Sequence, residues 1–391
     1  MHVLSVTPLF PSSAAPAPGV FVKERLKNLP SDVRTTVVRC RPHFPLVGFL
    51  KPHLGRSFPA FETVEGLPVH DLRFPYVPGA FKAQDGDRLG RALIAFVERH
   101  GADFDLFDAH FTHPTGCGAV IAAARFGRPT VITERGTIGS YLGDGRRGKM
   151  RAALLAATRL VAVSESLARI MREVAGKDLD VRVIGNGVDA ARFAPGDCAQ
   201  ARRALGLEGR GPVLLTVGGL VPRKGVMRVI EILPEILAKH PEAVYVVVGA
   251  GGAEGDYEAA CRAAVGAKGL EGSIRFEGAV APAALPDYYR AADVFCLSTT
   301  NEGWANVLQE SLAVGTPVVT TDVGGNREVV GSPDHGIVCR PADATALCDA
   351  LLAALGTRWD RSAISAWGRR RDWRDVGLEV EAVFREALGA H

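Results

Sequence analysis

Short β-branched runs alternate with amphipathic helical stretches along nearly the whole chain, and this alternation constrains the fold more than any other feature. Residues 2–7 and 33–39 are predicted strands on either side of a helix at 20–29. The same order returns later, where strands at 213–217 and 244–249 are separated by a helical stretch. Alternation of this kind is typical of parallel sheets covered by helices on both faces. We therefore expect an α/β chain with doubly wound parallel sheets.

The chain is long enough for two such sheets, since 391 residues exceed what one hydrophobic core ordinarily covers. The alternation pauses between residues 183 and 197, which hold two glycine-containing turn signals. We predict an N-terminal domain over 1–185, a C-terminal domain over 186–360, and helices at 361–391 that pack back across the junction. Ligands bind outside the carboxyl ends of parallel strands, so a cleft between the two domains is the expected site.

Composition excludes several classes of protein. A net charge of +3 is too small for a dedicated nucleic-acid binder. No stretch approaches the roughly 18 apolar residues of a spanning helix, and the N-terminal residues lack the basic region of a signal peptide. The seven cysteines form no CxxC pair, as expected for buried, reduced thiols. We expect a cytoplasmic protein.

Glycines and cations crowd the loop after the predicted strand at 213–217. Gly218 and Gly219 end the strand, and Arg223 and Lys224 follow before the next helix. Paired glycines let the backbone approach a ligand closely, and the two cations can hold a diphosphate. The spacing matches neither a Walker A sequence nor a GxGxxG fingerprint. Taken alone, it is more typical of a tight turn with two solvated cations.

Two glutamates eight positions apart flank the start of another predicted helix. Glu302 lies in the loop after a strand at 294–298, and Glu310 lies inside the helix that Asn306 is predicted to cap. The first turn of that helix suits an anion such as a diphosphate, and carboxylates accept hydrogen bonds from the vicinal hydroxyls of sugars. Alone, such glutamates are more often solvated or paired with surface cations.

The N-terminal half holds weaker candidates. Gly19 ends a Pro- and Ala-rich loop and opens a helix whose N-terminus could face the same ligand, although an ordinary βα loop looks the same. His110 and His113 follow a strand and could donate to a substrate hydroxyl, but they are too few for a zinc site. The acidic triplets at 85–87 and 103–105 precede elements, so we interpret them as turn and cap residues.

Together these motifs resemble the retaining GT-B glycosyltransferases of family four, the glycosyl transferases group 1. The resemblance rests on RVIGNGVDAARFAP at 182–195, VGGLVPRKGV at 217–226 and EGWANVLQESLAVGTPVVTTDVGGNREVV at 302–330. It extends over nearly the whole chain and implies a GT-B fold, with two Rossmann-like domains facing a central cleft. It also implies metal-independent hexosyl transfer from a nucleotide-diphosphate sugar, of UDP or GDP type, to a hydroxyl of a glycan or lipid-linked acceptor. Polysaccharide or glycoconjugate biosynthesis is the expected setting.

The resemblance also implies roles for single residues. Arg223 and Lys224 would hold the diphosphate and Glu302 would lie near the donor sugar, so these three are the predicted catalytic residues. Glu310 would hold the ribose hydroxyls. The remaining predicted donor contacts are Gly19, from the N-terminal domain, and Gly218, Gly219, Gly303, Trp304, Asn306, Val307 and Leu308. No cofactor and no metal is expected, because the cations and the helix N-terminus neutralise the leaving group.

The sequence departs from the family pattern at two places. Gly219 stands where the family often has an arginine, which removes one cation. Glu134-Arg135-Gly136 stands where many members carry an acceptor-side histidine. Arg135 is therefore an acceptor-side candidate, together with His110 and His113.

Three alternatives stay open. The apolar loop at 41–56 and the basic stretch at 146–154 could touch the anionic inner face of a membrane near a lipid-linked acceptor. A loop packed on its own domain and a solvated helix face explain the same residues. Sugar-nucleotide epimerases share the two-domain architecture, and a non-catalytic sugar-nucleotide binder would keep the same donor residues.

Overall fold

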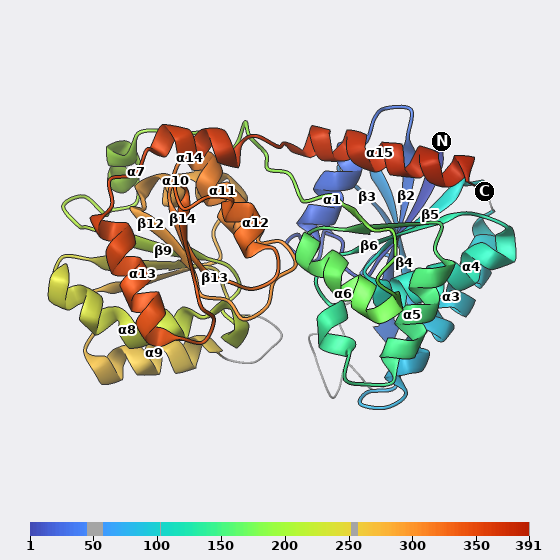
Figure 1. Cartoon of the computed structure of the whole chain (residues 1–391), viewed down its shortest axis with the longest axis horizontal. Helices are drawn as coiled ribbons and strands as arrows, with labels where there is room; N and C mark the ends of the chain where they lie inside the picture. Colours follow the sequence, from blue (N-terminus) through green and yellow to red (C-terminus); the bar gives the residue numbers. More distant parts are fainter. Residues whose placement is uncertain (45–57, 102, 252–256, 391) are drawn as a thin grey trace. The chain divides into compact units, whose positions relative to one another are not determined.

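The computed structural model describes residues 1–44, 58–101, 103–251 and 257–390 (Figure 1). Contacts divide the chain into two compact units: unit 1 is Met1–Gly187 with Trp373–His391, and unit 2 is Val188–Asp372. Each unit is built on one sheet whose strands are parallel except for a single antiparallel pair in unit 1. The predicted α/β class with two parallel sheets is therefore confirmed.

Unit 1 contains an eight-stranded sheet in the order β3-β4-β2-β1-β5-β6-β7-β8. Its strands are β1 (His2–Thr7), β2 (Arg34–His43), β3 (Phe61–Val64), β4 (Leu67–Pro75), β5 (Leu106–His110), β6 (Thr130–Glu134), β7 (Arg159–Ala162) and β8 (Arg182–Val183). Among these described strands, only β3 and β4 pair in the antiparallel sense. Because β2 and β5 lie on opposite sides of β1, the carboxyl ends of β1 and β5 form the switch point where such sheets bind ligands.

Helices cover both faces of this sheet (Figure 1). They are α1 (Val20–Lys27), α3 (Asp85–His100), α4 (Cys117–Phe126), α5 (Arg146–Ala156), α6 (Glu165–Ala175) and α15 (Trp373–Gly389), with short turns η2 (Lys82–Gln84), η3 (Thr112–Gly116) and η4 (Ile138–Tyr141). The C-terminal helix, α15, belongs to unit 1 and packs beside α1, burying Val380 and Phe384. Gly377 permits this approach, since a Cβ there would lie 1.9 Å from the carbonyl oxygen of Asn28.

Unit 2 contains a six-stranded, fully parallel sheet in the order β11-β10-β9-β12-β13-β14. Its strands are β9 (Val213–Val217), β10 (Val244–Val248), β11 (Ile274–Gly278), β12 (Val294–Leu297), β13 (Val318–Thr321) and β14 (Gly336–Cys339). Its helices are α7 (Cys198–Ala204), α8 (Val226–Lys239), α9 (Tyr257–Lys268), α10 (Leu285–Ala291), α11 (Asn306–Val314), α12 (Asn326–Val330), α13 (Ala344–Gly356) and α14 (Arg361–Gly368), with turns η5 (Pro222–Lys224) and η6 (Pro282–Ala284).

Two hydrophobic cores lie on the two faces of the unit 2 sheet. Leu215 points into the core that α10, α11 and α14 cover, whereas Leu214 points into the core beneath α8, α9 and α13. This alternation follows from the two-residue period of a strand, and it explains why these strands are continuously apolar. In the part of the chain that the structure describes, no helix is both long enough and apolar enough to cross a membrane.

Candidate functional site

The two loops singled out in unit 2 meet at the carboxyl ends of neighbouring strands β9 and β12. The carbonyl oxygen of Arg223 accepts a hydrogen bond from the backbone N–H of Thr300 at 2.9 Å, which joins the loops. Lys224 Nζ donates to Glu302 Oε1 at 2.6 Å, and Arg223 Nη1 lies 3.8 Å from the same oxygen. The three predicted catalytic residues therefore form one cluster.

The Lys224–Glu302 pair is partly shielded from water. The side chains of Lys224 and Glu302 are 14% and 10% exposed, against 43% for Arg223. Thr299 Oγ1 also donates to Glu302 Oε1, at 3.1 Å. Charges attract more strongly where less water surrounds them, so Glu302 holds Lys224 more firmly than a surface pair would.

Two glycines allow the loops to approach each other. Gly225 has φ +79°, and a Cβ there would lie 2.1 Å from the carbonyl oxygen of Ser298. Gly324 has φ +53°, and a Cβ there would lie 1.7 Å from the carbonyl oxygen of Glu302. By contrast, a Cβ at Gly219 would lie in ordinary contact with the carbonyl oxygen of Ala250, at 3.9 Å, and would meet no other atom of the described residues within 4 Å.

The helix that follows, α11, begins at Asn306. Its N-cap residue is Ala305, which has an extended backbone and no side chain that can cap. The prediction that Asn306 caps the helix is therefore wrong, because the backbone enters helical geometry one residue earlier. Gly303 is buried in the preceding loop, and its carbonyl oxygen accepts from Gly325 N–H at 3.2 Å.

The predicted donor contacts from Trp304 to Leu308 differ in how much of their side chains is exposed. Leu308 is fully buried in the core of unit 2, so only its backbone is left for a ligand. Val307 is partly exposed. Trp304 is also partly exposed, and its Nε1 donates to Gln309 Oε1 at 3.0 Å.

Glu310 lies in the second turn of α11 and is held by Tyr289. The Tyr289 hydroxyl donates to Glu310 Oε2 at 2.8 Å, and among the described residues no hydrogen bond is found for Glu310 Oε1. Burial raises the pKa of Glu310 above its ordinary value, against the hydrogen bond from Tyr289 and the charge of Arg192. One carboxylate oxygen is thus fixed, and the other can accept from a ligand.

In unit 1, His110 and Arg135 belong to a buried polar cluster at the ends of β5 and β6. Arg135 Nε donates to His110 Nδ1 at 2.9 Å, and Arg135 Nη1 donates to Asn186 Oδ1 at 3.2 Å. His110 Nε2 lies 3.0 Å from Asp108 Oδ2 and 3.1 Å from Ser5 Oγ. His110 is fully buried, so it acts on its surroundings through Arg135 and Asp108.

The geometry assigns the tautomer of His110. Because Nδ1 accepts from Arg135, the proton of the neutral ring is on Nε2, facing Asp108. Burial lowers the pKa of His110 to about 4, with Asp108 opposing the shift and Arg135 adding to it. The ring therefore stays neutral at physiological pH.

His113 lies apart from this pair and contacts Tyr141. Their ring centroids are 5.9 Å apart in an edge arrangement, and the buried His113 Nε2 has no hydrogen-bond partner among the described residues. Burial lowers the pKa of His113 to about 4, and Arg146 adds to the shift. The structure thus brings together two of the three acceptor-side candidates.

A residue that the motifs did not indicate shapes the backbone around Arg135. Glu134 is fully buried, and its Oε2 accepts from both the N–H and the hydroxyl of Thr112. Its Oε1 accepts from the N–H groups of three successive residues, Gly136, Thr137 and Ile138. The loop that presents Arg135 therefore wraps around one buried carboxylate.

Gly19 forms the N-cap of α1 with φ +76°. A Cβ at this position would lie 2.3 Å from the carbonyl oxygen of Leu9, so only glycine fits without a shift. The guanidinium carbon of Arg135 lies 5.3 Å from the ring centroid of Phe21, in the first turn of α1. Gly19 and Arg135 therefore belong to one region of unit 1.

The remaining predictions concern a metal and a membrane. Across residues 1–44, 58–101, 103–251 and 257–390, no group of three or more His, Cys, Asp or Glu is placed to hold a metal ion. The apolar loop predicted at 41–56 lies outside the described residues from position 45 onward. The basic stretch at 146–154 falls in α5, where Arg146 pairs with Asp144 and Lys149 pairs with Asp87 at 2.8 Å.

Comparison with known proteins gives matches over both units. Residues 198–371 match the family described as Glycosyl transferases group 1, and residues 47–192 match Glycosyltransferase Family 4. A putative teichuronic acid biosynthesis glycosyltransferase of Bacillus subtilis is 30% identical over 379 residues, covering 93% of this chain and 90% of that protein. A D-inositol 3-phosphate glycosyltransferase of Acidothermus cellulolyticus is 32% identical, with 84% and 79% covered.

Solved structures match over the full length. The crystal structure of Anabaena HepE with UDP has a TM-score of 0.76 and 19% identity, covering 98% of this chain and all of that one. Sucrose-phosphate synthase from Thermosynechococcus elongatus has a TM-score of 0.77 and 20% identity, with both chains fully covered. At these identities the structural likeness shows the shared fold.

Proposed function

The chain belongs to the retaining glycosyltransferases of family four, with their GT-B fold, and from this we propose that it moves a sugar from a nucleotide-diphosphate sugar to a hydroxyl of a glycan or lipid-linked acceptor. The observation that carries the proposal is the cluster of Arg223, Lys224 and Glu302 between two strand ends of unit 2. The names of relatives, which include teichuronic acid biosynthesis, favour a role in polysaccharide or glycoconjugate synthesis.

We assign the donor to unit 2. In this proposal Glu310 Oε1 accepts from the ribose hydroxyls while Tyr289 holds the other oxygen. The N-terminus of α11 carries the positive end of the helix dipole, which suits the diphosphate. Gly219 and the backbone from Gly303 to Leu308 complete the predicted contacts. Solved relatives that hold UDP and UDP-glucose favour a uridine donor, with a guanosine donor as the second choice.

The reaction that follows is a displacement at the anomeric carbon with retained configuration. The bond from that carbon to the diphosphate oxygen breaks, and its electron pair leaves with the diphosphate. Arg223 and Lys224 stabilise the departing negative charge, as does the positive end of α11. The acceptor hydroxyl forms the new bond from the same face, and its proton passes to a donor phosphate oxygen. Glu302 keeps Lys224 in place beside the donor sugar.

Unit 1 supplies the acceptor side in this proposal. Arg135 is the favoured contact, and its guanidinium is fixed by His110 and Asn186 on two of its nitrogens. Gly19 would present the N-terminus of α1 to the diphosphate, and His113 is the second acceptor-side choice. An epimerase would convert the sugar nucleotide without any acceptor, so product analysis in the absence of acceptor separates the two reactions.

A thermal-shift panel tests the donor assignment. Wild-type protein and Glu310→Ala are each melted with UDP, GDP, ADP, CMP and the common sugar conjugates. A ligand at about 100 times its Kd adds about 2.7 kcal/mol of stability, which is a readable shift. We expect one nucleotide to stabilise the wild type and not the variant. Absence of a shift with every nucleotide would contradict the donor site and favour a non-catalytic role.

A further inference from the structure

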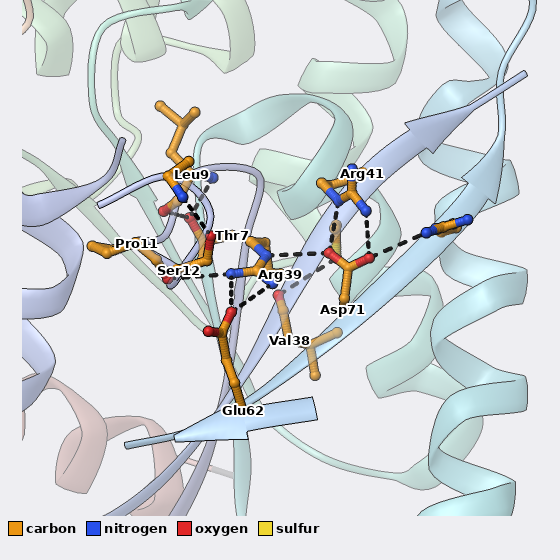
Figure 2. Close-up of polar contacts among 12 residues, drawn as sticks. Thr7, Leu9, Pro11, Ser12, Val38, Arg39, Arg41, Glu62 and Asp71 are labelled. Atoms are coloured by element: carbon orange, nitrogen blue, oxygen red, sulfur yellow. Dashed lines mark hydrogen bonds and ion pairs between the residues drawn. The ribbon is translucent and has the colours of Figure 1, made fainter. Parts of the chain in front are cut away.

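A buried arginine in unit 1 joins three strands to the loop that precedes α1. Arg39 lies in the middle of β2, opposite Thr7 at the end of β1, and is 2% exposed. Figure 2 shows its guanidinium between Glu62 of β3 and Asp71 of β4. Arg39 Nη1 and Nη2 each lie 3.1 Å from Glu62 Oε1, and Nε donates to Asp71 Oδ1 at 3.2 Å. Every nitrogen of the group is engaged.

The same two residues hold the β1–α1 loop at two points. Arg39 Nη1 also donates to the carbonyl oxygen of Pro11 at 3.2 Å. Glu62 Oε2 accepts from the backbone N–H of Ser13 at 3.0 Å. Residues on both sides of Ser12 are therefore fixed to one ion pair between a buried arginine and a partly buried glutamate, which we call the Arg39–Glu62 clamp.

From the clamp, short contacts lead to Gly19. Ser12 and Ala15 exchange backbone hydrogen bonds of 3.0 and 3.1 Å, which close the middle of the loop. At its start, Thr7 Oγ1 donates to the carbonyl oxygen of Leu9 at 2.9 Å, and that oxygen is the atom a Cβ at Gly19 would meet. The backbone of Leu9 therefore lies close to Gly19, and the clamp holds the residues between them.

Asp71 of β4 holds the Arg39 side of the clamp. Its two oxygens accept from Arg41 Nε at 2.7 Å and Arg41 Nη2 at 2.6 Å, beside the bond from Arg39 (Figure 2). The ring of Phe58 lies against both arginines, with its centroid 4.6 Å from the guanidinium carbon of Arg39 and 4.0 Å from that of Arg41. The Arg39 side chain consequently cannot move away from the β1–α1 loop without losing its contacts to Glu62, Asp71 and Phe58.

Energetics favour a geometric role for this cluster. A buried ion pair adds little net stability, because the cost of removing both charges from water offsets their attraction. A fully bonded guanidinium nevertheless fixes the direction of every partner. Burial raises the pKa of Glu62, but the bonds from Ser13 and Arg39 together lower it below its ordinary value, so the carboxylate stays charged.

We infer that Arg39 and Glu62 are positioning residues of the transfer reaction, which hold residues 9–19 so that Gly19 and the first turn of α1 meet the sugar nucleotide. This inference rests on the proposed function. It adds two residues, on β2 and β3, that touch no substrate and act through the loop.

The test compares Glu62→Gln with Asp103→Asn. In Glu62→Gln the amide oxygen still accepts from Arg39, but the amide nitrogen meets the Ser13 N–H as a second donor. Asp103→Asn makes the same chemical change in an exposed pair with Arg34, at the opposite end of β2. For each protein we would measure amide hydrogen exchange over residues 8–19, the thermal midpoint, and kcat and KM with UDP-glucose and GDP-mannose as donor probes.

We expect Glu62→Gln to speed exchange over residues 8–19 and to lower kcat about tenfold or more, since small misplacements are costly in catalysis. Asp103→Asn should change neither. Unchanged kcat in a folded Glu62→Gln would overturn the inference, as would a loss of activity that only follows the loss of folded protein. If Glu62→Gln does not fold, Arg39→Lys decides the same question, because a single ammonium group cannot reach Pro11, Glu62 and Asp71 together.

The proposed function is tested separately, by the donor turnover of the wild-type protein. If the wild type turns over no donor, both proposals fail, while hydrogen exchange still reports whether Glu62 holds the loop. If the wild type is active and the clamp variants match it, only the positioning inference fails.

Discussion

The polar residues at the strand ends of the two units differ in how much of them is left for a ligand. In unit 2, Lys224 and Glu302 are partly exposed, and Glu310 keeps one carboxylate oxygen unused among the described residues. In unit 1, His110 and Arg135 are buried and bonded to each other. Groups of the first kind can act on a substrate's charge. In the second kind most polar atoms bond to one another, and among the described residues Arg135 keeps only Nη2 without a hydrogen-bond partner.

Burial explains the difference. A polar group removed from water must find partners inside the protein, so buried charges come in bonded sets. Glu134 is the extreme case, since it accepts from Thr112 and from three successive backbone N–H groups. The buried charges of unit 1 therefore mainly fix the conformation of its loops. We expect substitutions of these residues to lower the stability of the protein before they affect its activity.

The largest effect should come from Lys224→Ala in unit 2. This change removes the cation nearest Glu302 and leaves Arg223 alone to face the leaving group. We expect kcat to fall on the order of 10²-fold or more, as for the removal of one oxyanion donor, with little change in the thermal midpoint. Steady-state kinetics measure this, with Lys239→Ala, an exposed lysine at the end of α8, as the control. Near-normal turnover would remove Lys224 from the catalytic set.

The contrast also explains what could be predicted from the sequence. The parallel-sheet alternation was enough for the fold, because each strand and helix shows its own local periodicity. In unit 2, Arg223, Lys224 and Glu302 could be placed together, since each follows a strand directly and parallel strands end at one edge. Their ion pair could not be foreseen, because it depends on how closely Gly225 and Gly324 let two loops approach.

In unit 1 most of the partners lie too far apart in the chain to form a motif, and only Asp108 is close to His110 in sequence. His110 meets Ser5 from β1, Arg135 from the loop after β6, and Asp108 from its own strand. Nothing in the local pattern of Ser5 or Asp108 distinguishes them from other strand residues. The burial of His110, which turns a predicted substrate contact into a partner of Arg135, becomes visible only when the sheet is assembled.

Acid should weaken unit 1 through its buried histidines, an effect of intermediate size. The pKa of His110 is about 4 in the folded protein against 6.5 when unperturbed, so the unfolded state binds more protons between these values. Stability is then complete above about pH 6.5 and falls as the pH drops toward 4, by up to about 3 kcal/mol. His113 adds a shift of the same sign.

Denaturant unfolding at neutral pH and at about pH 5 measures this slope. His110→Gln keeps a neutral group that can accept from Arg135 and donate to Asp108, so it should flatten the pH dependence. The double variant with His113→Gln should flatten it further. An unchanged slope in the double variant would show that other groups carry the acid sensitivity.

The smallest effect returns to unit 2, where Tyr289→Phe tests how Glu310 is held. The change removes one hydroxyl from a fully buried ring and leaves a carboxylate oxygen without its donor, which costs about 1.5 kcal/mol for a bond to a charged group. Since that bond lowers the pKa of Glu310, its loss lets the carboxyl take up a proton at higher pH. We expect nucleotide affinity to fall several-fold, and more steeply as the pH is lowered.

The adjacent Tyr288 is a matched control, because its hydroxyl donates to Glu277 at 2.9 Å and not to Glu310. Titration calorimetry with the nucleotide that stabilises the wild type compares the two variants, and equal losses in both would mean that Tyr289 affects binding only through the packing of α10.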